Sequence, residues 1–313
     1  QNQMAQIQEN VRFAINEIST QTKNSRIYPP GCDKDVSVAN LLWSDVISNK
    51  PVNNAGLGLN VIQSKEASIY VYERLKNAYI GSDILYVGGL NNQVEYKADT
   101  YINAETKWKL DGDYKRPKNS LMLAMDENCN QLTVFLADFN NYEDETNTID
   151  INEIIIKPFG HVEQSMQNCT VSIFGRFYCR SISPVKLHGV EFPETIIRKS
   201  TLFPIEQNYY FVAPSTQVDN QGQHYPALYR NDQELVQGVE KMNVYLGLDT
   251  TGDNVTNQYV TTQSVNEKQW HDVKSIRVNM TMRSLERVSP ISGLDNDGYI
   301  RMEYSQTVFL RNQ

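Results

Sequence analysis

The chain has 313 residues, of which 29 are basic and 37 acidic, so its formal net charge is −8 at pH 7. A chain of this length buries about three quarters of its unfolded surface and holds one large domain or two modest ones. The acidic residues are scattered and the basic residues do not cluster, which argues against a nucleic-acid-binding surface. The 18 tyrosines, with many Asn, Gln and Thr, are typical of secreted, strand-rich proteins.

The first segment of the chain predicts an amphipathic helix. In QNQMAQIQENVRFAINEISTQTKNSR, apolar residues recur at spacings of three and four, which places them on one face of a helix. These residues are Met4, Ile7, Val11, Ala14 and Ile18. The helix ends before the Tyr-Pro-Pro-Gly sequence at 28–31, because proline cannot continue it. Since Gln1 lies inside the helical pattern, we expect that a preceding segment has been removed.

After the helix, the pattern changes to short runs of β-forming residues with turn residues between them. These runs lie at 68–75, 82–89, 120–125, 131–139, 151–157, 170–179, 207–213, 241–248, 275–284 and 304–310. Several alternate between apolar and polar residues, as half-buried strands do. One long helix followed by about ten strands predicts an α+β fold, in which a long N-terminal amphipathic helix packs on a mostly antiparallel β-sheet head. We expect residues 1–28 to form the helix and residues 29–313 the β-rich head.

Four cysteines without a C-x-x-C motif favour disulfides over a metal site. They are Cys32, Cys129, Cys169 and Cys179. Four cysteines allow three pairings. The segment CTVSIFGRFYC can form a strand pair with a turn near Gly175, which favours Cys169–Cys179 and leaves Cys32–Cys129. Buried free thiols in a reducing compartment are the alternative.

The sequence offers little for catalysis. It contains no G-x-S-x-G elbow, P-loop or H-E-x-x-H motif. Carboxylate pairs such as Glu143–Asp144 fall in a polar loop, whereas a general acid needs a water-poor site. The four histidines lie far apart and have no partner at catalytic or metal-binding spacing; they are His161, His188, His224 and His271. We therefore expect neither an enzyme nor a cofactor.

One segment, GLDTTGDNVTNQY at 247–259, could be a calcium loop or the tip of a hairpin. If Asp249 is taken as position 1 of an EF-hand loop, the residues at positions 1, 3 and 5 carry side-chain oxygens, and position 5 is Asp253. Asn254 then stands where glycine belongs and Val260 where the bidentate glutamate belongs. Clusters of Asp, Asn and Gly between strands usually form turns. We expect a hairpin tip. Asp249 and Asp253 remain the candidate ligands for calcium; Asp295 and Asp297 could add ligands from a distance, but no spacing argument supports them.

The same region carries a resemblance to a known family. Residues 234–284, which include ELVQGVEKMNVYLGLDTTGDNV and HDVKSIRVNMTMRS, resemble the C-terminal half of PilW-type minor pilins of the type IV pilus. The residues in register are Leu235, Gly238, Val239, Glu240, Met242, Tyr245, Gly247, Asp249, Gly252, Asp253, Tyr259, Val273, Ser275, Arg277 and Ser284.

Shorter segments resemble the same family in the same order. They include ENVRFAINEI followed by YPPGC near the start, and GSDIL at 81–85. Further along, YCR at 178–180, NYYFVAPS at 208–215, ALYR at 227–230 and LRN at 310–312 fit as well. Cys129 lies where the family has an Asp-Cys pair, although the acidic residue here is Asp126, three residues earlier. The resemblance therefore extends over nearly the whole chain.

This resemblance implies a non-catalytic minor pilin that joins a tip or initiation complex and primes type IV pilus assembly. Residues 1–28 would be the C-terminal half of the pilin helix, with the apolar stripe as its assembly face, and the missing N-terminal part would lie in the inner membrane. The implied partners are other minor pilins, a PilC/PilY-type tip adhesin and the major pilin.

The resemblance also implies a location and downstream roles. The protein would lie in the inner membrane and periplasm of a Gram-negative bacterium before assembly, and outside the cell at the pilus tip afterwards. Twitching motility, adhesion and DNA uptake by naturally competent cells would follow from pilus formation. The alternatives are a J-type pseudopilin of type II secretion and a stand-alone β-rich adhesin or glycan binder.

Overall fold

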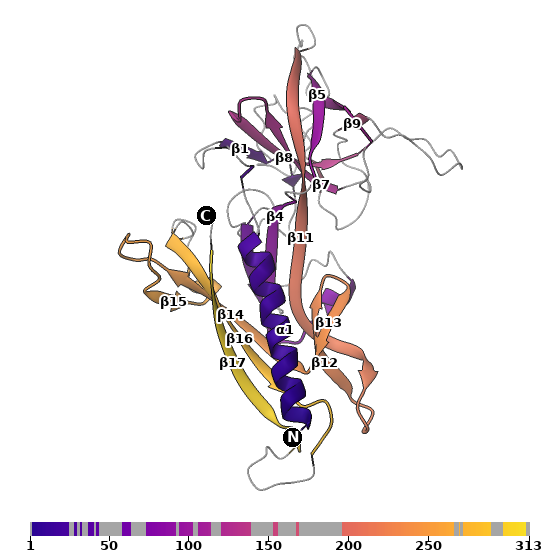
Figure 1. The fold of residues 1–313 in the computed structure, drawn as a ribbon, viewed down its shortest axis with the longest axis vertical. Helices are drawn as coiled ribbons and strands as arrows, with labels where there is room; N and C mark the ends of the chain where they lie inside the picture. Colours follow the sequence, from indigo (N-terminus) through magenta and orange to yellow (C-terminus); the bar gives the residue numbers. More distant parts are fainter. Residues whose placement is uncertain are drawn as a thin grey trace, which may run out of the picture. The chain divides into compact units, whose positions relative to one another are not determined.

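The computed structural model shows two compact units, each built from separate parts of the chain (Figure 1). Unit 1 comprises residues 1–25, 58–88 and 207–313, and unit 2 comprises residues 26–57 and 89–206. The structure describes residues 2–24, 28–29, 32, 37–40, 42–43, 58–63, 73–91, 94–102, 106–113, 120–138, 153–155, 167–168, 196–265, 269, 272–288 and 297–310.

Unit 1 begins with the helix α1 (Asn2–Asn24). Its remaining elements are β3 (Gly58–Gln63), the 3₁₀ helix η2 (Glu73–Asn77), β4 (Asp83–Leu90), β12 (His224–Arg230), β13 (Gln233–Gln237), β14 (Val239–Leu248), β15 (Gln258–Val260), the 3₁₀ helix η3 (Thr262–Ser264), β16 (Val273–Arg283) and β17 (Arg301–Phe309). Residues 207–218 of the strand β11 (Ile196–Val218) also belong to it, whereas the last two residues of β4, Gly89 and Leu90, belong to unit 2.

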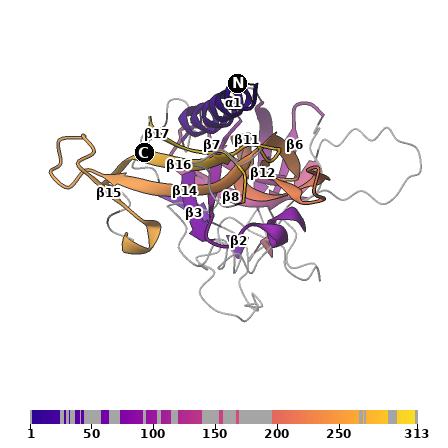
Figure 2. The ribbon, with the colours of Figure 1, turned by 90° about the horizontal axis from the view of Figure 1, so that it is seen from below.

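Two sets of antiparallel strands form unit 1. The first set is a sheet with the strand order β15-β14-β16-β17. In the second set, β3 pairs with β4, β11 pairs with β12, and β12 pairs with β13. The helix α1 packs on β13, β16 and β17, and Figure 2 shows it over one face of the β14-β16-β17 strands. Ile7, Val11, Ala14 and Ile18 are buried there. Burial of this apolar stripe is what holds a helix of mostly polar residues in place.

Unit 2 contains the remaining strands: β1 (Ser37–Asn40), β2 (Leu42–Trp43), β5 (Tyr96–Ile102), β6 (Thr106–Leu110), β7 (Ser120–Asp126), β8 (Gln131–Ala137), β9 (Glu153–Ile155) and β10 (Gln167–Asn168). The strand order is β1-β8-β7-β11-β5-β6-β9, where residues 196–206 of β11 supply the central strand. All of these pairs are antiparallel except β1 with β8. Trp108 stacks on Phe135 in the core, with ring centroids 4.3 Å apart.

The structure corrects the expected fold class. We expected an α+β fold with a long N-terminal amphipathic helix packed on a mostly antiparallel β-sheet head, as in pilins. This is wrong, because the fold is mostly β: the described residues contain one α-helix, of 23 residues, beside large antiparallel sheets. Unit 2 contains no α-helix among its described residues. The residues expected to form one head, 29–313, are distributed over two units.

The fold class was predicted wrongly because the apolar pattern did not reveal several of the strands. The first part of β11, IIRKSTLFPI, and the strands β5 and β6 carry Lys and Thr at many positions, so their alternation is weak. They form strands because their neighbours pair with them, which is the usual dependence of β-structure on context. The region 68–75, predicted as a strand, contains part of η2. The predicted strand at 170–179 lies outside the described residues.

Candidate functional site

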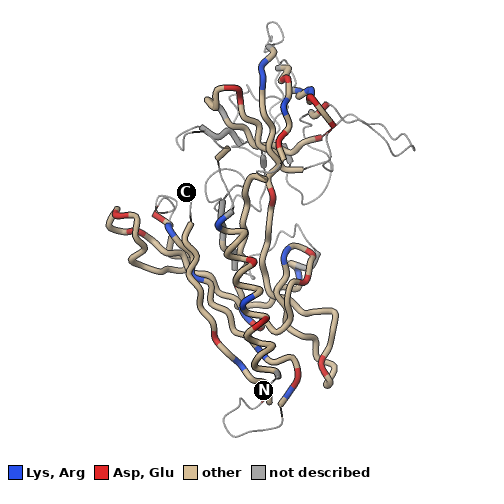
Figure 3. The backbone as a smooth tube through the Cα atoms, viewed as in Figure 1, with Lys and Arg blue, Asp and Glu red and all other residues tan. Residues whose placement is uncertain are grey.

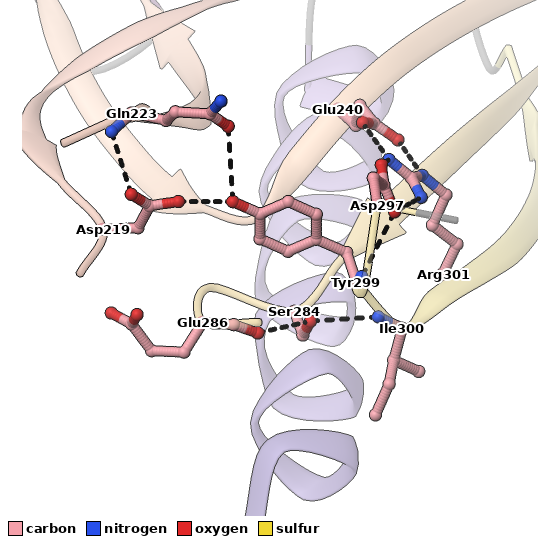
Figure 4. Close-up of polar contacts among 9 residues, drawn as sticks. All are labelled: Asp219, Gln223, Glu240, Ser284, Glu286, Asp297, Tyr299, Ile300 and Arg301. Atoms are coloured by element: carbon pink, nitrogen blue, oxygen red, sulfur yellow. Dashed lines mark hydrogen bonds and ion pairs between the residues drawn. The ribbon is translucent and has the colours of Figure 1, made fainter. Parts of the chain in front are cut away.

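A cluster of charged and polar side chains joins four segments of unit 1, and we call it the Tyr299 cluster (Figure 4 shows all of its members except Arg283). It lies where the β11–β12 turn, β14, the end of β16 and the segment leading into β17 meet. Its members are Asp219, Gln223, Glu240, Arg283, Asp297, Tyr299 and Arg301. No spacing rule could have found it, because Asp219 and Tyr299 are 80 residues apart.

The turn between β11 and β12 fixes the position of Asp219. Its Oδ1 atom accepts hydrogen bonds from the backbone N–H groups of Gln221 and Gln223, both at 2.8 Å. Gly222 has a φ of +78°, a conformation that glycine adopts without strain. The sequence DNQGQ therefore folds into a turn that leaves the second carboxylate oxygen of Asp219 free for Tyr299.

Tyr299 is the centre of the cluster and is only 2% exposed. Its hydroxyl donates a hydrogen bond to Oδ2 of Asp219. This bond lowers the pKa of the Asp219 carboxyl, and the backbone bonds from Gln223 and Gln221 add to the effect against the opposing contribution of burial. The ring face of Tyr299 contacts the guanidinium of Arg283, whose Cζ lies 3.9 Å from the ring centroid. This cation–π contact stabilises a buried arginine whose Nε and Nη2 find no hydrogen-bond partner among the described residues.

Arg301 supplies the second half of the cluster. Its Nε and Nη2 donate to the two carboxylate oxygens of Glu240 at 2.7 and 2.9 Å, which is the bidentate geometry of a strong ion pair. Its Nη1 and Nη2 also donate to Asp297, at 2.9 and 2.6 Å. The hydrogen bond from Arg301 lowers the pKa of Asp297 to about 2.

Ser284 and Glu286 connect this cluster to the end of β16. Ser284 Oγ donates to the carbonyl of Glu286 at 2.9 Å and accepts from the N–H of Ile300 at 3.1 Å. Glu286 accepts from the hydroxyl of Tyr225 at 2.6 Å. The charged groups of the region thus largely bind one another, so the arrangement suits a rigid joint between strands better than acid–base chemistry.

The segment Gly81-Ser82-Asp83 forms a second polar connection within unit 1. Ser82 Oγ accepts from the N–H of Met242 at 2.9 Å and donates to its carbonyl at 3.1 Å. Asp83 Oδ2 accepts from the N–H of Val244 at 2.8 Å. The strand β14 pairs with β15 only from Leu246 to Leu248, so these two side chains satisfy backbone groups on the part of its edge that β15 leaves open.

The hairpin predicted at Asp249 is confirmed. The segment from 249 to 257 connects the antiparallel strands β14 and β15. Asp249 is 5% exposed, and its two carboxylate oxygens accept from the N–H groups of Thr251, Gly252 and Asn254 at 3.1, 2.7 and 2.7 Å. Although burial raises the pKa of Asp249, these backbone bonds outweigh it and lower the pKa. The carboxylate thus holds the turn together.

Asp253 contributes little to the same loop, since its Oδ1 accepts only from the N–H of Val255 at 2.9 Å. Asp297, which could have added a ligand from a distance, is bound to Arg301, and Asp295 lies outside the described residues. In the part of the chain that the structure describes, no group of three or more His, Cys, Asp or Glu residues is placed to hold a metal ion.

The base of this hairpin explains why position 247 is a glycine. A Cβ atom built on Gly247 would lie 2.7 Å from Thr256 Cγ2 and 2.9 Å from Tyr259 Cε1, and it would clash with Ser275 Oγ. Arg277 stacks on Tyr259, with 3.6 Å between Cζ and the ring centroid. These five residues are packed too closely for a side chain at position 247.

The structure buries most of the predicted assembly face of the helix. Ile7, Val11, Ala14 and Ile18 are at most 3% exposed and pack inside unit 1, whereas Met4 is 36% exposed. Arg230 fixes the helix further through an ion pair with Glu17 at 2.7 Å. Four of the five predicted residues are therefore not accessible to another subunit in this structure. None of the described helices has both the length and the hydropathy that a bilayer-spanning helix needs.

Of the predicted disulfides, the structure contains Cys32–Cys129, with 5.6 Å between the Cα atoms. Both half-cystines pack against the core cluster of unit 2 that includes Leu123, Val134 and Phe203. Cys169 and Cys179 lie outside the described residues.

In a comparison with known protein families, residues 210–312 match type IV pilus-assembly protein W (PilW). A search of curated proteins and a search of solved structures each found no match to the chain. The matched residues include β12 to β17 and all members of the Tyr299 cluster. This part of the chain is PilW-like, and the match supports a role in type IV pilus assembly.

Proposed function

We propose that this protein is a non-catalytic minor pilin that joins the tip or initiation complex of a type IV pilus and primes pilus assembly. The PilW match over residues 210–312 carries this proposal. The proposal does not rest on the expected α+β fold, which the structure corrects.

The packing of α1 supports the proposal. The helix lies on β13, β16 and β17, which all fall within the matched residues, so the first and last parts of the chain form one unit. The protein would be held in the inner membrane before assembly. In that arrangement, unit 1 moves together with its helix into the growing filament.

The disulfide supports an extracytoplasmic location, and the charge distribution gives no reason to propose nucleic-acid binding. Figure 3 shows acidic and basic residues interspersed along the described chain, without a basic stripe for nucleic acid. The Cys32–Cys129 disulfide is typical of oxidising compartments such as the periplasm. The partners would be other minor pilins, a PilC/PilY-type tip adhesin and the major pilin, in a Gram-negative bacterium. Twitching motility, adhesion and DNA uptake would depend on the protein only through pilus formation.

A pull-down tests the proposed partners. The tagged chain is incubated with purified soluble domains of minor pilins, tip adhesin and major pilin from the same organism, with and without EDTA. We expect saturable capture of at least one minor pilin, unchanged by EDTA, and none by a secreted β-rich protein of similar net charge. Capture of pseudopilins of type II secretion alone would contradict the proposal in favour of the secretion role.

A further inference from the structure

A small pocket in unit 1 lies beside the Gly81-Ser82-Asp83 segment and opens to solvent. Its volume is about 100 Å³. It is lined by Val61 of β3, Asp83 of β4, Asn243, Val244 and Tyr245 of β14, and Thr261, Thr262 and Gln263 at η3. A cavity of roughly 150 Å³ holds a benzene ring, so this pocket suits a smaller group, such as the end of one side chain.

Two side-chain oxygens of the residues that line this pocket accept no hydrogen bond from the described residues. Asp83 uses its Oδ2 for the N–H of Val244 and, at 3.4 Å, the Nδ2 of Asn243, while its Oδ1 accepts no hydrogen bond from any described residue. Thr262 Oγ1 is buried and likewise finds no hydrogen-bond partner in the described part of the chain. A buried hydroxyl oxygen such as that of Thr262 normally has a partner, because leaving it unpaired is unfavourable.

The electrostatics of the pocket favour a cation. Burial raises the pKa of Asp83, and the hydrogen bonds from Val244 and Asn243 and the charge of Lys241 only partly oppose it. Among the described residues no cation forms an ion pair with this carboxylate, and Lys241 acts on it from beyond contact distance. A positive group in the pocket would relieve this destabilisation of the charged carboxylate.

The geometry selects among cations. A divalent metal ion requires about six oxygen ligands and more than the single carboxylate present here. A guanidinium is best bound by two acceptors in one plane, but only one oxygen of Asp83 is free. An ammonium group is a compact charge with three rotatable donors, and the residues that line the pocket offer acceptors for it in the Asp83 carboxylate and the side-chain oxygens of Thr262, Gln263 and Asn243.

We propose that this pocket binds the ammonium end of a lysine side chain from another pilus subunit. The identity of the partner rests on the proposed function, whereas the preference of the pocket for a primary ammonium group does not. Docking of one lysine would fix a neighbouring subunit at the edge of β14, at the point where Ser82 and Asp83 hold that strand.

Titration of the isotopically labelled 313-residue chain with n-butylammonium chloride tests the pocket. We expect saturable chemical-shift changes at the amides of Val244 and Thr262, and none with 1-butanol or with sodium chloride at the same ionic strength. Asp83→Asn keeps an oxygen for the Val244 N–H but places an amide where the free carboxylate oxygen was, so affinity should fall at least tenfold. Thr262→Val should weaken binding several-fold. Glu303→Gln, which removes an exposed carboxylate from β17, should leave binding unchanged.

Two outcomes would overturn the pocket proposal: shifts that do not saturate, or equal affinity in the wild-type chain and Asp83→Asn. The pull-down separates this proposal from the proposed function. If butylammonium binds at the pocket and no pilus subunit is captured, the pocket stands and the function fails. If pilus subunits are captured equally by the wild-type chain and Asp83→Asn, and butylammonium does not bind, the function stands and the pocket proposal fails.

Discussion

Replacing Ile18 by alanine tests whether α1 is held to unit 1 through its apolar stripe. Ile18 is 1% exposed, and the change removes three carbon atoms from a packed position. At about 0.8 kcal/mol for each buried methylene-sized group, the loss of burial costs about 2.4 kcal/mol. The cavity left behind adds to this, so a total of about 2–5 kcal/mol is expected. Phe13→Ala is the matched control, because Phe13 lies on the same helix and is 51% exposed.

Native-state hydrogen exchange followed by mass spectrometry measures this effect in unit 1 alone. Peptides from β14 and β16 report the opening of unit 1, and peptides from β7 and β8 serve as a reference in unit 2. A loss of 2 kcal/mol corresponds to a roughly 30-fold increase in the exchange rate of the most protected amides. Phe13→Ala should change the rate less than about threefold. Equal effects of the two substitutions would refute the helix packing described above.

Three further predictions follow from single contacts. Gly247→Ala should destabilise unit 1 by about 1–3 kcal/mol, because its Cβ would meet closely packed atoms on three sides, and urea unfolding measures this. The pKa of Asp297 should be about 2 in the folded protein, below its ordinary value of 3.8. The stability that this carboxylate contributes is therefore present above pH 3.8 and is lost as the pH falls toward 2. NMR of the carboxyl group measures this pKa, and Arg301→Met should raise it again. Reduction of Cys32–Cys129, which are 97 residues apart, should destabilise unit 2 by about 2–5 kcal/mol, measured by urea unfolding with and without reductant.

Each of these predictions has a control. Gly112→Ala places a Cβ in open space and should change stability by less than about 0.5 kcal/mol, so an equal effect at both glycines would contradict the packing account. An Asp297 pKa near 3.8 in the wild-type chain would show that Arg301 does not hold this carboxylate. A reductant that leaves unit 2 unaffected would contradict a stabilising role of the disulfide.

The sequence predicted those elements whose pattern is strong within a short window. The helix was found from its spacing and ends at Asn24, shortly before the predicted stop at the prolines. Six strands overlap runs of β-forming residues that the sequence predicted: β4, β7, β8, β14, β16 and β17. The hairpin at Asp249 was predicted because turn chemistry is local: one carboxylate binds N–H groups within five residues.

The sequence did not predict the contacts between residues that are far apart in the chain. Tyr299 and Asp219 are brought together by the pairing of strands far apart in the chain, and neither residue has a neighbour that would mark it. Glu240 was recognised only as part of a family pattern, and its pairing with Arg301, 61 residues later, gave no signal. The division into two units was not seen because β11, a single strand of 23 residues, contributes to both.

Counting surface pili in a deletion strain tests the central claim, a role in type IV pilus assembly, most directly. The gene is deleted without affecting its neighbours and is restored from a plasmid, and pili are counted by electron microscopy and by shearing them from the cells. We expect few or no pili in the deletion strain, recovery with the restored gene, and normal type II secretion throughout. Normal piliation in the deletion strain would contradict the claim.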